Sequence, residues 1–198
     1  MMKNPIQKVT NKLQYRAIGI FHGIYNPNSE EELNRGFITD NQGIKIESVV
    51  LGKALSLIKK YIDLEKSYFW IVYPKNKNTQ NLHLQIAGIW DPYNLNDIGN
   101  EDSKKKPLEL LEEINLTDNY FSIRGELIYV NLKKKELVVK ICSSSQAKKY
   151  KNNNFKIIIE GELSIEHLNT FVSLDVIREG NTLRMVKYEV IKKLLPKK

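Results

Sequence analysis

Alternating apolar and polar positions dominate the first half of the chain and predict strands. In YRAIGIFHGIY, residues 15–25, apolar side chains fall on both faces, which is typical of a long, curved strand. Its glycines favour a bend or a close approach to a neighbouring strand. Residues 35–51 predict two strands joined by a turn at 40–43, and residues 67–90 predict two more around a Lys- and Asn-rich turn.

One segment of the first half changes to a helical period. In LGKALSLIKKYIDL, residues 51–64, the apolar residues Leu51, Leu55, Ile58 and Ile62 recur at spacings of four, three and four. Such spacing places them in one stripe and leaves the lysines outside it. The pattern predicts a short amphipathic helix between the third and fourth strands.

The stretch YFSIRGELIYVNLKKKELVVKI, residues 120–141, predicts a hairpin at the start of the second half, with three lysines in its turn. Apolar residues alternate with polar ones on both of its strands. The positions expected to face the interior are Phe121, Ile123, Leu127 and Tyr129 on the first strand and Leu137, Val139 and Ile141 on the second. For Tyr129, the expected position is the interior or the barrel rim, and stacking against a nucleobase is the alternative.

The remaining second half predicts three strands and one helical turn. FKIIIEG, residues 155–161, is the first strand, and Ser164 is suited to open a single helical turn near His167. FVSLDVI and TLRMVKYEVI, residues 171–177 and 182–191, flank a loop in which Gly180 can adopt a positive backbone angle.

Both halves therefore contain the same elements in the same order: three strands, a helix or helical turn, and a final hairpin. This order resembles the OB-fold, a five-stranded Greek-key barrel. The predicted fold class is mainly β with short helices, arranged as two tandem OB-like five-stranded β-barrels. We expect an N-terminal barrel at 1–93, an acidic linker at 94–118 with at most a short helix in LELLEEI, and a C-terminal barrel at 119–198.

The second half carries most of the net charge of +8. Residues 119–198 hold 16 Lys and Arg against 8 Asp and Glu, whereas the linker holds 3 against 7. A basic surface attracts polyanions such as nucleic acid, and it also suits an anionic membrane surface or an acidic protein. The alternative is that lysine is simply the default surface residue, because the chain is rich in Lys, Asn and Ile, as AT-rich genomes tend to encode.

Four stretches resemble a family of cyanobacterial proteins: LQYRAIGIFHGIYNP, LGKALSLIKKYIDLEKSYFWIVYPK, LHLQIAGIWDP and FSIRGELIY. The likeness covers both halves but not the connector, which in the relatives is longer and rich in basic residues and proline. The resemblance therefore gives no role to the short acidic connector of this chain. It implies a cyanobacterial or plastid setting and no particular activity.

If the second half is an OB-like barrel, it binds single strands through its second and third strands and through two loops, one between strands one and two and one between strands four and five. Cations there and in the loop at 143–154 can follow a phosphate backbone, and Tyr150 can stack on a base. The candidate nucleic-acid-binding residues are Lys133, Lys134, Lys135, Lys140, Lys148, Lys149, Tyr150, Lys151, Lys156, Arg178 and Arg184. For the three lysines at 133–135, a solvated turn is the alternative.

These features predict a non-enzymatic protein that binds nucleic acid, single-stranded RNA or DNA, mainly through the second barrel. The competing hypothesis is a protein-binding scaffold or assembly factor of a cyanobacterial complex, in which exposed strand edges pair with a partner. The three histidines lie far apart without metal-ligand spacing, and no glycine-rich phosphate loop occurs. We expect no cofactor and no metal, although distant residues can assemble a site after folding.

The single cysteine, Cys142, excludes an intramolecular disulfide and fits a reducing compartment. The first residues lack the apolar core of a signal peptide, and no later run approaches the ~18 apolar residues of a membrane span. We therefore expect a soluble cytoplasmic protein without a membrane partner. The sequence does not indicate its oligomeric state.

Overall fold

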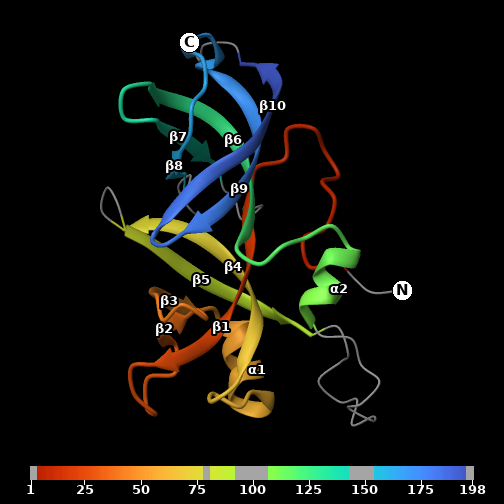
Figure 1. Ribbon diagram of the computed structural model, residues 1–198, viewed down its shortest axis with the longest axis vertical. Coiled ribbons are helices and arrows are strands. Elements are labelled where there is room, and N and C mark those ends of the chain that lie inside the picture. Colours follow the sequence, from red (N-terminus) through yellow and green to blue (C-terminus); the bar gives the residue numbers. More distant parts are fainter. Residues whose placement is uncertain (1–3, 78–80, 92–106, 143–153, 195–198) are drawn as a thin grey trace, which may run out of the picture. The chain divides into compact units, whose positions relative to one another are not determined.

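The computed structural model of the protein describes residues 4–77, 81–91, 107–142 and 154–194 (Figure 1). These ranges contain ten strands, two α-helices and one short 3-10 helix. In chain order the elements are β1 (Arg16–Pro27), β2 (Arg35–Thr39), β3 (Lys45–Val50), α1 (Gly52–Tyr61), β4 (Ser67–Lys77), β5 (Asn81–Trp90), α2 (Pro107–Glu113), β6 (Tyr120–Asn131), β7 (Glu136–Ile141), β8 (Phe155–Glu160), η3 (Ile165–His167), β9 (Thr170–Glu179) and β10 (Thr182–Lys193).

The strands close into two rings of five. In the first ring the hydrogen-bonded order is β2-β3-β5-β4-β1, and a further pairing of β1 with β2 closes it. In the second ring the order is β6-β7-β8-β10-β9, and β6 pairs with β9. The third and fifth strands of each ring are parallel, namely β3 with β5 and β8 with β10. This is the connectivity of the OB-fold, so the predicted pair of tandem OB-like barrels is confirmed.

The residues divide into two compact units that do not follow the chain strictly. Unit 1 consists of residues 1–7, 19–73 and 84–120, and unit 2 consists of residues 8–18, 74–83 and 121–198. Unit 2 therefore holds the second ring together with residues 8–15 of the N-terminal arm, the start of β1, the end of β4 and the start of β5. The boundaries expected from the sequence, at 93/94 and 118/119, stay a prediction.

The first strand of each ring passes so close to a neighbouring strand that it needs a glycine. A Cβ atom at Gly23 of β1 would lie 2.5 Å from the carbonyl oxygen of Thr39. A Cβ atom at Gly125 of β6 would lie 2.3 Å from the carbonyl oxygen of Lys140. Since backbone atoms cannot move aside as a flexible side chain can, only glycine fits at these positions. The close approach expected from the glycines of the first strand is confirmed at Gly23.

Aromatic side chains fill the interior of unit 1. Trp70 of β4 is fully buried, and its indole Nε1 donates a hydrogen bond to the carbonyl oxygen of Gly23 at 2.8 Å. Tyr25 packs edge-on against it, with the ring centroids 5.9 Å apart. The predicted helix is present as α1, and it buries Ala54 and Ile58.

A second apolar cluster of unit 1 draws on the expected linker. Leu111 of α2 and Leu116, which follows it, are both buried. Their partners in the cluster are Ile20, Phe69 and Trp90. The short helix expected in LELLEEI is therefore confirmed as α2, and its burial makes this part of the connector a folded component of unit 1.

The interior of unit 2 follows the predicted alternation with one exception. Of the seven positions expected inside, Phe121, Ile123, Leu127, Leu137, Val139 and Ile141 are buried. Tyr129 is 43% exposed, so the interior position expected for it is wrong. The register of β6 against β7 shifts between Leu127 and Tyr129. Such a bulge inserts one extra residue and reverses the alternation, which turns Tyr129 to the outer face.

Candidate nucleic-acid interface

The outer face of β6, β7 and β8 in unit 2 is organised in three rows that run across the strands. Residues that face one another in an antiparallel pair have neighbouring side chains on the same face. The registers give a basic row of Lys140 and Lys156, a central row of Tyr129, Val138 and Ile158, and an acidic row of Glu136 and Glu160. The central row offers an apolar and aromatic strip between charges of opposite sign.

The basic row is partly neutralised by its neighbours. The Lys140 Nζ lies 3.1 Å from Glu126 Oε2, and this hydrogen bond raises the pKa of Lys140. The Tyr15 hydroxyl donates a hydrogen bond to the other carboxylate oxygen of Glu126, and burial together with this bond raises the pKa of Tyr15. Lys156 is exposed and forms no ion pair within the described ranges. Lys156 is therefore the member of this row whose charge faces solvent.

The turn between β6 and β7 presents the three predicted lysines, all of them exposed. The Asn131 side-chain oxygen accepts a hydrogen bond from the backbone N–H of Lys134 at 3.0 Å, which fixes the turn. Lys135 has a φ of 50°, and its Nζ lies 2.7 Å from Glu162 Oε1. Lys133 and Lys134 have no ion pair with any described residue, so two of the three charges are available to a ligand.

The two arginines predicted near the last hairpin already have partners. Arg178 is only 6% exposed, and its Nη1 donates a hydrogen bond to the carbonyl oxygen of Gly180 at 2.5 Å. Its position does not match the expected place on the binding surface, because its guanidinium braces the turn where Gly180 has a φ of 58°. Arg184 of β10 lies 2.5 Å from Glu179 Oε1 and stays partly exposed.

The described lysines fall at both ends of the three-row face. The turn at 132–135 adjoins the acidic row, whereas Lys140 and Lys156 lie beyond the central row. A polyanion that crosses the central row would therefore meet cations on either side of it, and on the side of the turn it would also pass the carboxylates of the acidic row. The other candidates, Lys148, Lys149, Tyr150 and Lys151, lie outside the described residues.

A pocket of about 380 Å³ opens beside the acidic row. Lys134 and Lys135 contribute to it from the turn after β6, and Asn181 and Thr182 contribute from the turn after β9. In OB-fold proteins these two loops flank the ligand-binding face. The pocket therefore lies where an OB barrel commonly takes its ligand.

The N-terminal arm is fastened to unit 2 by Arg124, a residue for which the sequence suggested no role. Arg124 is buried, and it donates hydrogen bonds to the Ser173 hydroxyl at 2.6 Å and to the carbonyl oxygen of Lys12 at 2.7 Å. These bonds fix the arm near Tyr15, whose ring packs edge-on against Phe171. They explain why Tyr15 can reach the carboxylate of Glu126.

Unit 1 exposes an aromatic side chain on its own second strand that the sequence reading missed. Phe37 of β2 is 39% exposed and lies opposite Glu47 of β3. The signal was available in RGFIT, because the buried Gly36 and Ile38 leave Phe37 on the other face. Phe37 is therefore a second candidate for stacking against a base.

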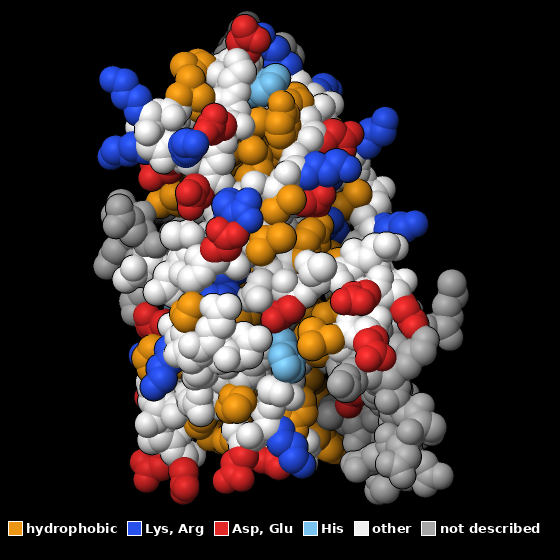
Figure 2. All heavy atoms as spheres, in the orientation of Figure 1, with side chains coloured by type: hydrophobic (Ala, Val, Ile, Leu, Met, Phe, Trp, Pro, Cys, Tyr) orange, Lys and Arg blue, Asp and Glu red, His pale blue; other side chains and the backbone are white. Residues whose placement is uncertain are grey.

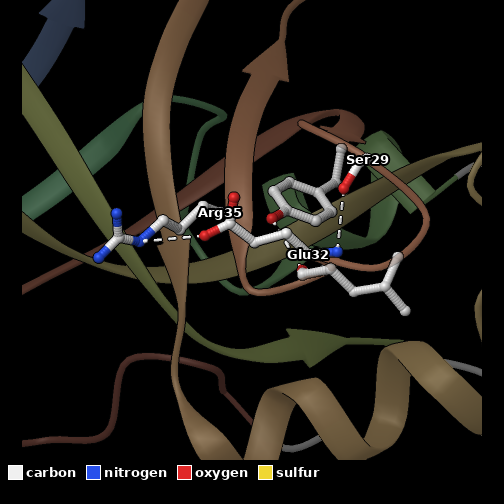
Figure 3. A network of polar contacts seen from close by, with 5 residues as sticks. Ser29, Glu32 and Arg35 are labelled. Atoms are coloured by element: carbon white, nitrogen blue, oxygen red, sulfur yellow. Dashed lines mark hydrogen bonds and ion pairs between the residues drawn. The ribbon is translucent and has the colours of Figure 1, made fainter.

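The loop between β1 and β2 of unit 1 is held by a polar network (Figure 3). The backbone N–H of Glu32 donates to the Ser29 hydroxyl at 3.1 Å, and Arg35 Nε lies 3.6 Å from Glu32 Oε1. The Tyr25 hydroxyl donates to the carbonyl oxygen of Leu33 at 3.0 Å. The loop is thus ordered and acidic, at the place in the barrel where unit 2 has its lysine turn.

Charges of both signs share the surface of the second ring. Figure 2 shows Lys and Arg side chains interspersed with Asp and Glu over the part of the molecule that contains β6 to β10. Recognition of a polyanion on this side must therefore depend on local groups rather than on one uniform field.

The described residues contain no group of three or more His, Cys, Asp or Glu placed to hold a metal ion. Among the same residues, no helix is long and apolar enough to cross a bilayer.

Two family descriptions match the chain, one for each ring. Residues 17–97 match the PatR RNA-binding protein, N-terminal OB-fold domain. Residues 123–192 match the cyanobacterial OB-fold-like RNA-binding domain, C-terminal. Together the two matches span about three quarters of the chain, and they confirm the cyanobacterial resemblance of both halves.

A solved structure of a single-stranded DNA-binding protein from Thermus aquaticus, in a deletion-mutant form, is similar to this chain with a TM-score of 0.43. The two are 10% identical, and the similarity covers 92% of this chain and 97% of that one. A TM-score of this size supports no assignment of function. No functionally curated protein matches this sequence.

Proposed function

Because this chain belongs to the cyanobacterial family with two OB-fold RNA-binding domains, we propose that it binds single-stranded RNA on the outer face of β6, β7 and β8. Nucleic-acid binding is the property described for the family. The single-stranded ligand, the face and the residues that contact it are inferred from the geometry of unit 2.

The central row suits unstacked bases. Single strands bind OB barrels by stacking bases on exposed aromatic side chains while cations follow the backbone. Tyr129 is exposed beside Val138 and Ile158, so a base stacked on its ring would also cover apolar surface. The bases of a duplex stay inside the helix and gain nothing from such a strip.

The cations are arranged for a backbone that passes along this strip. Lys133 and Lys134 lie in the turn at one end, and Lys156 lies on β8 at the other. None of the three forms an ion pair within the described part of the chain, so each can contact a phosphate without breaking an existing bond. Lys135, Lys140 and Arg184 have carboxylate partners and would contribute less.

The outward position of Tyr129 is the observation that carries the proposal. The bulge in β6 exposes an aromatic ring beside the lysine turn, at the face where OB barrels bind single strands. The Tyr129 hydroxyl accepts a hydrogen bond from Asn131 Nδ2 at 3.1 Å, which links the side chain to the turn, and the exposed ring would in addition stabilise a bound base by about 1–3 kcal/mol. We further propose that the protein acts by binding alone, without catalysis.

A charge reversal in the turn tests the proposed face. The variant Lys133→Glu, Lys134→Glu, Lys135→Glu should bind a single-stranded oligoribonucleotide about a hundredfold more weakly in fluorescence anisotropy. The slope of log K against log salt should fall by about 1.4, since Lys133 and Lys134 each lose a phosphate contact that accounts for about 0.7. The matched control is Lys53→Glu, Lys59→Glu, Lys60→Glu on the exposed side of α1, which changes the net charge equally.

The affinity of the control variant for the oligoribonucleotide should fall by no more than about threefold, because the change in net charge acts on it only through the long-range field. Equal losses in both triple variants would show that net charge alone drives binding, and the proposed face would be abandoned. Wild-type protein that binds no oligoribonucleotide at low salt would overturn the function itself.

A protein-binding scaffold is the second candidate, and one observation favours it. Val186, Tyr188 and Val190 of β10 are apolar or aromatic and exposed. If the wild-type protein does not bind RNA and the lysine-turn variant still captures a protein partner, the scaffold hypothesis is favoured over RNA binding.

A further inference from the structure

We infer that the pocket beside the acidic row selects guanine, an inference that rests on the proposed binding of single-stranded RNA. Its lining combines apolar side chains with hydrogen-bonding groups of two kinds. Leu82, Ile158 and Leu183 provide the apolar surface, and every lining residue belongs to unit 2. A volume of about 380 Å³ lies within the range of ~300–1,000 Å³ that is usual for small-molecule sites.

The acceptors of the pocket are two carboxylates that face each other. Glu136 of β7 and Glu160 of β8 are directly opposed in the antiparallel register, and both line the pocket. Like charges in this arrangement destabilise a sheet. Lys135 pairs with Glu162 and Arg184 pairs with Glu179, and both cations also interact electrostatically with Glu160.

Neither Glu136 nor Glu160 forms an ion pair or a side-chain hydrogen bond with any described residue. An ionised carboxylate only accepts hydrogen bonds, so the ligand that suits this wall must present N–H donors. Unfavourable residue pairs such as two opposed carboxylates are expected at functional sites, where a bound ligand offsets their repulsion. A donor-rich base edge would replace water at both carboxylates and relieve their unfavourable proximity.

Guanine is the base whose edges match this lining. Its pairing edge presents two adjacent donors, N1–H and the 2-amino group, which fit the two oxygens of one carboxylate as a guanidinium does. Uracil offers a single donor between two carbonyl oxygens, and both of these would be repelled by the carboxylates. Adenine and cytosine each place a ring-nitrogen acceptor next to their amino group, which brings one repulsive contact.

The opposite edge of guanine requires donors, and the pocket supplies them. Lys134 and Lys135 line it from the turn after β6, and lysine is a frequent partner of guanine O6 and N7. The side-chain amide of Asn181 lines it from the turn after β9 and can donate as well. Carboxylates on one wall and ammonium groups at the rim thus match the donor edge and the acceptor edge of the same base.

The experiment compares oligoribonucleotides of equal length that differ at alternate positions: uridine throughout, or uridine alternating with guanosine, inosine, adenosine or cytidine. Binding of the full chain is measured by fluorescence anisotropy. The guanosine oligomer should bind about tenfold more tightly than the others, the discrimination expected of one bidentate contact. Inosine, which lacks the 2-amino group, should lose most of that advantage.

The variant Glu136→Gln, Glu160→Gln should reduce the preference for guanosine over uridine to about twofold or less. The control Glu166→Gln, Glu189→Gln removes the same charge from exposed positions and should keep the full preference. The ratio of affinities is the readout, because loss of two negative charges raises affinity for every oligomer.

Two outcomes separate this inference from the function on which it rests. Tight binding with equal affinity for all five oligomers, or a guanosine preference that survives in the pocket variant, overturns the inference and leaves RNA binding standing. Absence of binding to every oligomer overturns the proposed function.

Discussion

The β1–β2 loop of unit 1 and the β6–β7 turn of unit 2 hold the same place in two barrels of the same connectivity, yet they carry opposite charge. The first contains Glu30, Glu31 and Glu32, and the second contains three consecutive lysines. The strands of an OB barrel fix where a ligand can lie, whereas the loops decide which ligand is attracted. The comparison therefore favours unit 2 as the unit that we propose to bind the polyanion.

The strand faces next to these loops differ in the same sense. In unit 1 the exposed Phe37 lies opposite Glu47, so a carboxylate adjoins the aromatic ring. In unit 2 the exposed Tyr129 lies opposite Val138, and Ile158 extends the apolar row. A phosphate near Phe37 would be repelled, whereas one near Tyr129 would have the lysine turn beside it.

The largest expected effect is a loss of stability at the glycine that the first strand of each barrel needs. Gly125→Val should lower the free energy of unfolding by about 3 kcal/mol or more, because its Cβ would meet the Lys140 carbonyl oxygen at 2.3 Å. Gly23→Val should cost a similar amount, and urea unfolding followed by far-UV circular dichroism, which reports the strands of both rings, measures both. The control is Gly52→Ala at the start of α1, where an added Cβ meets nothing within 4 Å. If either valine variant were as stable as that control, the two barrels would not be equivalent scaffolds.

The exposed aromatic residues give the next largest effect and separate the units. Tyr129→Ala should weaken binding of a single-stranded oligoribonucleotide about tenfold, since a stacked base is worth about 1–3 kcal/mol. Phe37→Ala should change it less than twofold. Anisotropy titrations of both variants at one salt concentration make the comparison. The reverse order would assign the principal site to unit 1.

Reversing the charge of the β1–β2 loop should change the affinity for RNA by less than the loss of Tyr129 does. Glu30→Lys, Glu31→Lys, Glu32→Lys should raise affinity for the same oligomer about threefold at low salt, and the gain should vanish at high salt because it is a field effect. In the described part of unit 1 the neighbours of Phe37 on the adjacent strands are Asn26 and Glu47 rather than apolar residues, so added charge alone cannot build an equivalent site. A gain of a hundredfold would show that loop charge suffices and that the strand face is irrelevant.

The smallest effect is expected at Lys135. Its φ of 50° favours glycine, so Lys135→Gly should raise the free energy of unfolding by at most about 1 kcal/mol. Affinity for RNA should fall less than in Lys134→Ala, because Lys135 already pairs with Glu162. Calorimetric melting temperatures and anisotropy titrations test the two statements separately. A loss of affinity larger than that of Lys134→Ala would show that the ion pair opens to meet the ligand.

Much of the candidate face could be located from the sequence, and its details could not. The lysine turn lies where the alternation of YFSIRGELIYVNLKKKELVVKI predicts it, and Gly180 takes the positive angle expected of its loop. The bulge that exposes Tyr129 left no comparable signal, because a single inserted residue reverses a period of two without changing composition. The opposed pair Glu136 and Glu160 was equally hidden, since it depends on the register of β7 against β8, which pairs residues that are not adjacent in the chain.

The sequence by itself determined the order of strands and turns, because a period of two or of 3.6 is a local property of neighbouring residues. From that order followed the two barrels, the helix α1 and the position of the lysine turn. Only the tertiary structure decided which charges remain available. Lys140 is neutralised by Glu126 and Lys135 by Glu162, while Arg178 is buried against its own turn. The Lys140 pair is set by the register of β6 against β7, and the Lys135 pair by the return of the chain after β8, so neither distance follows from the local period of the sequence.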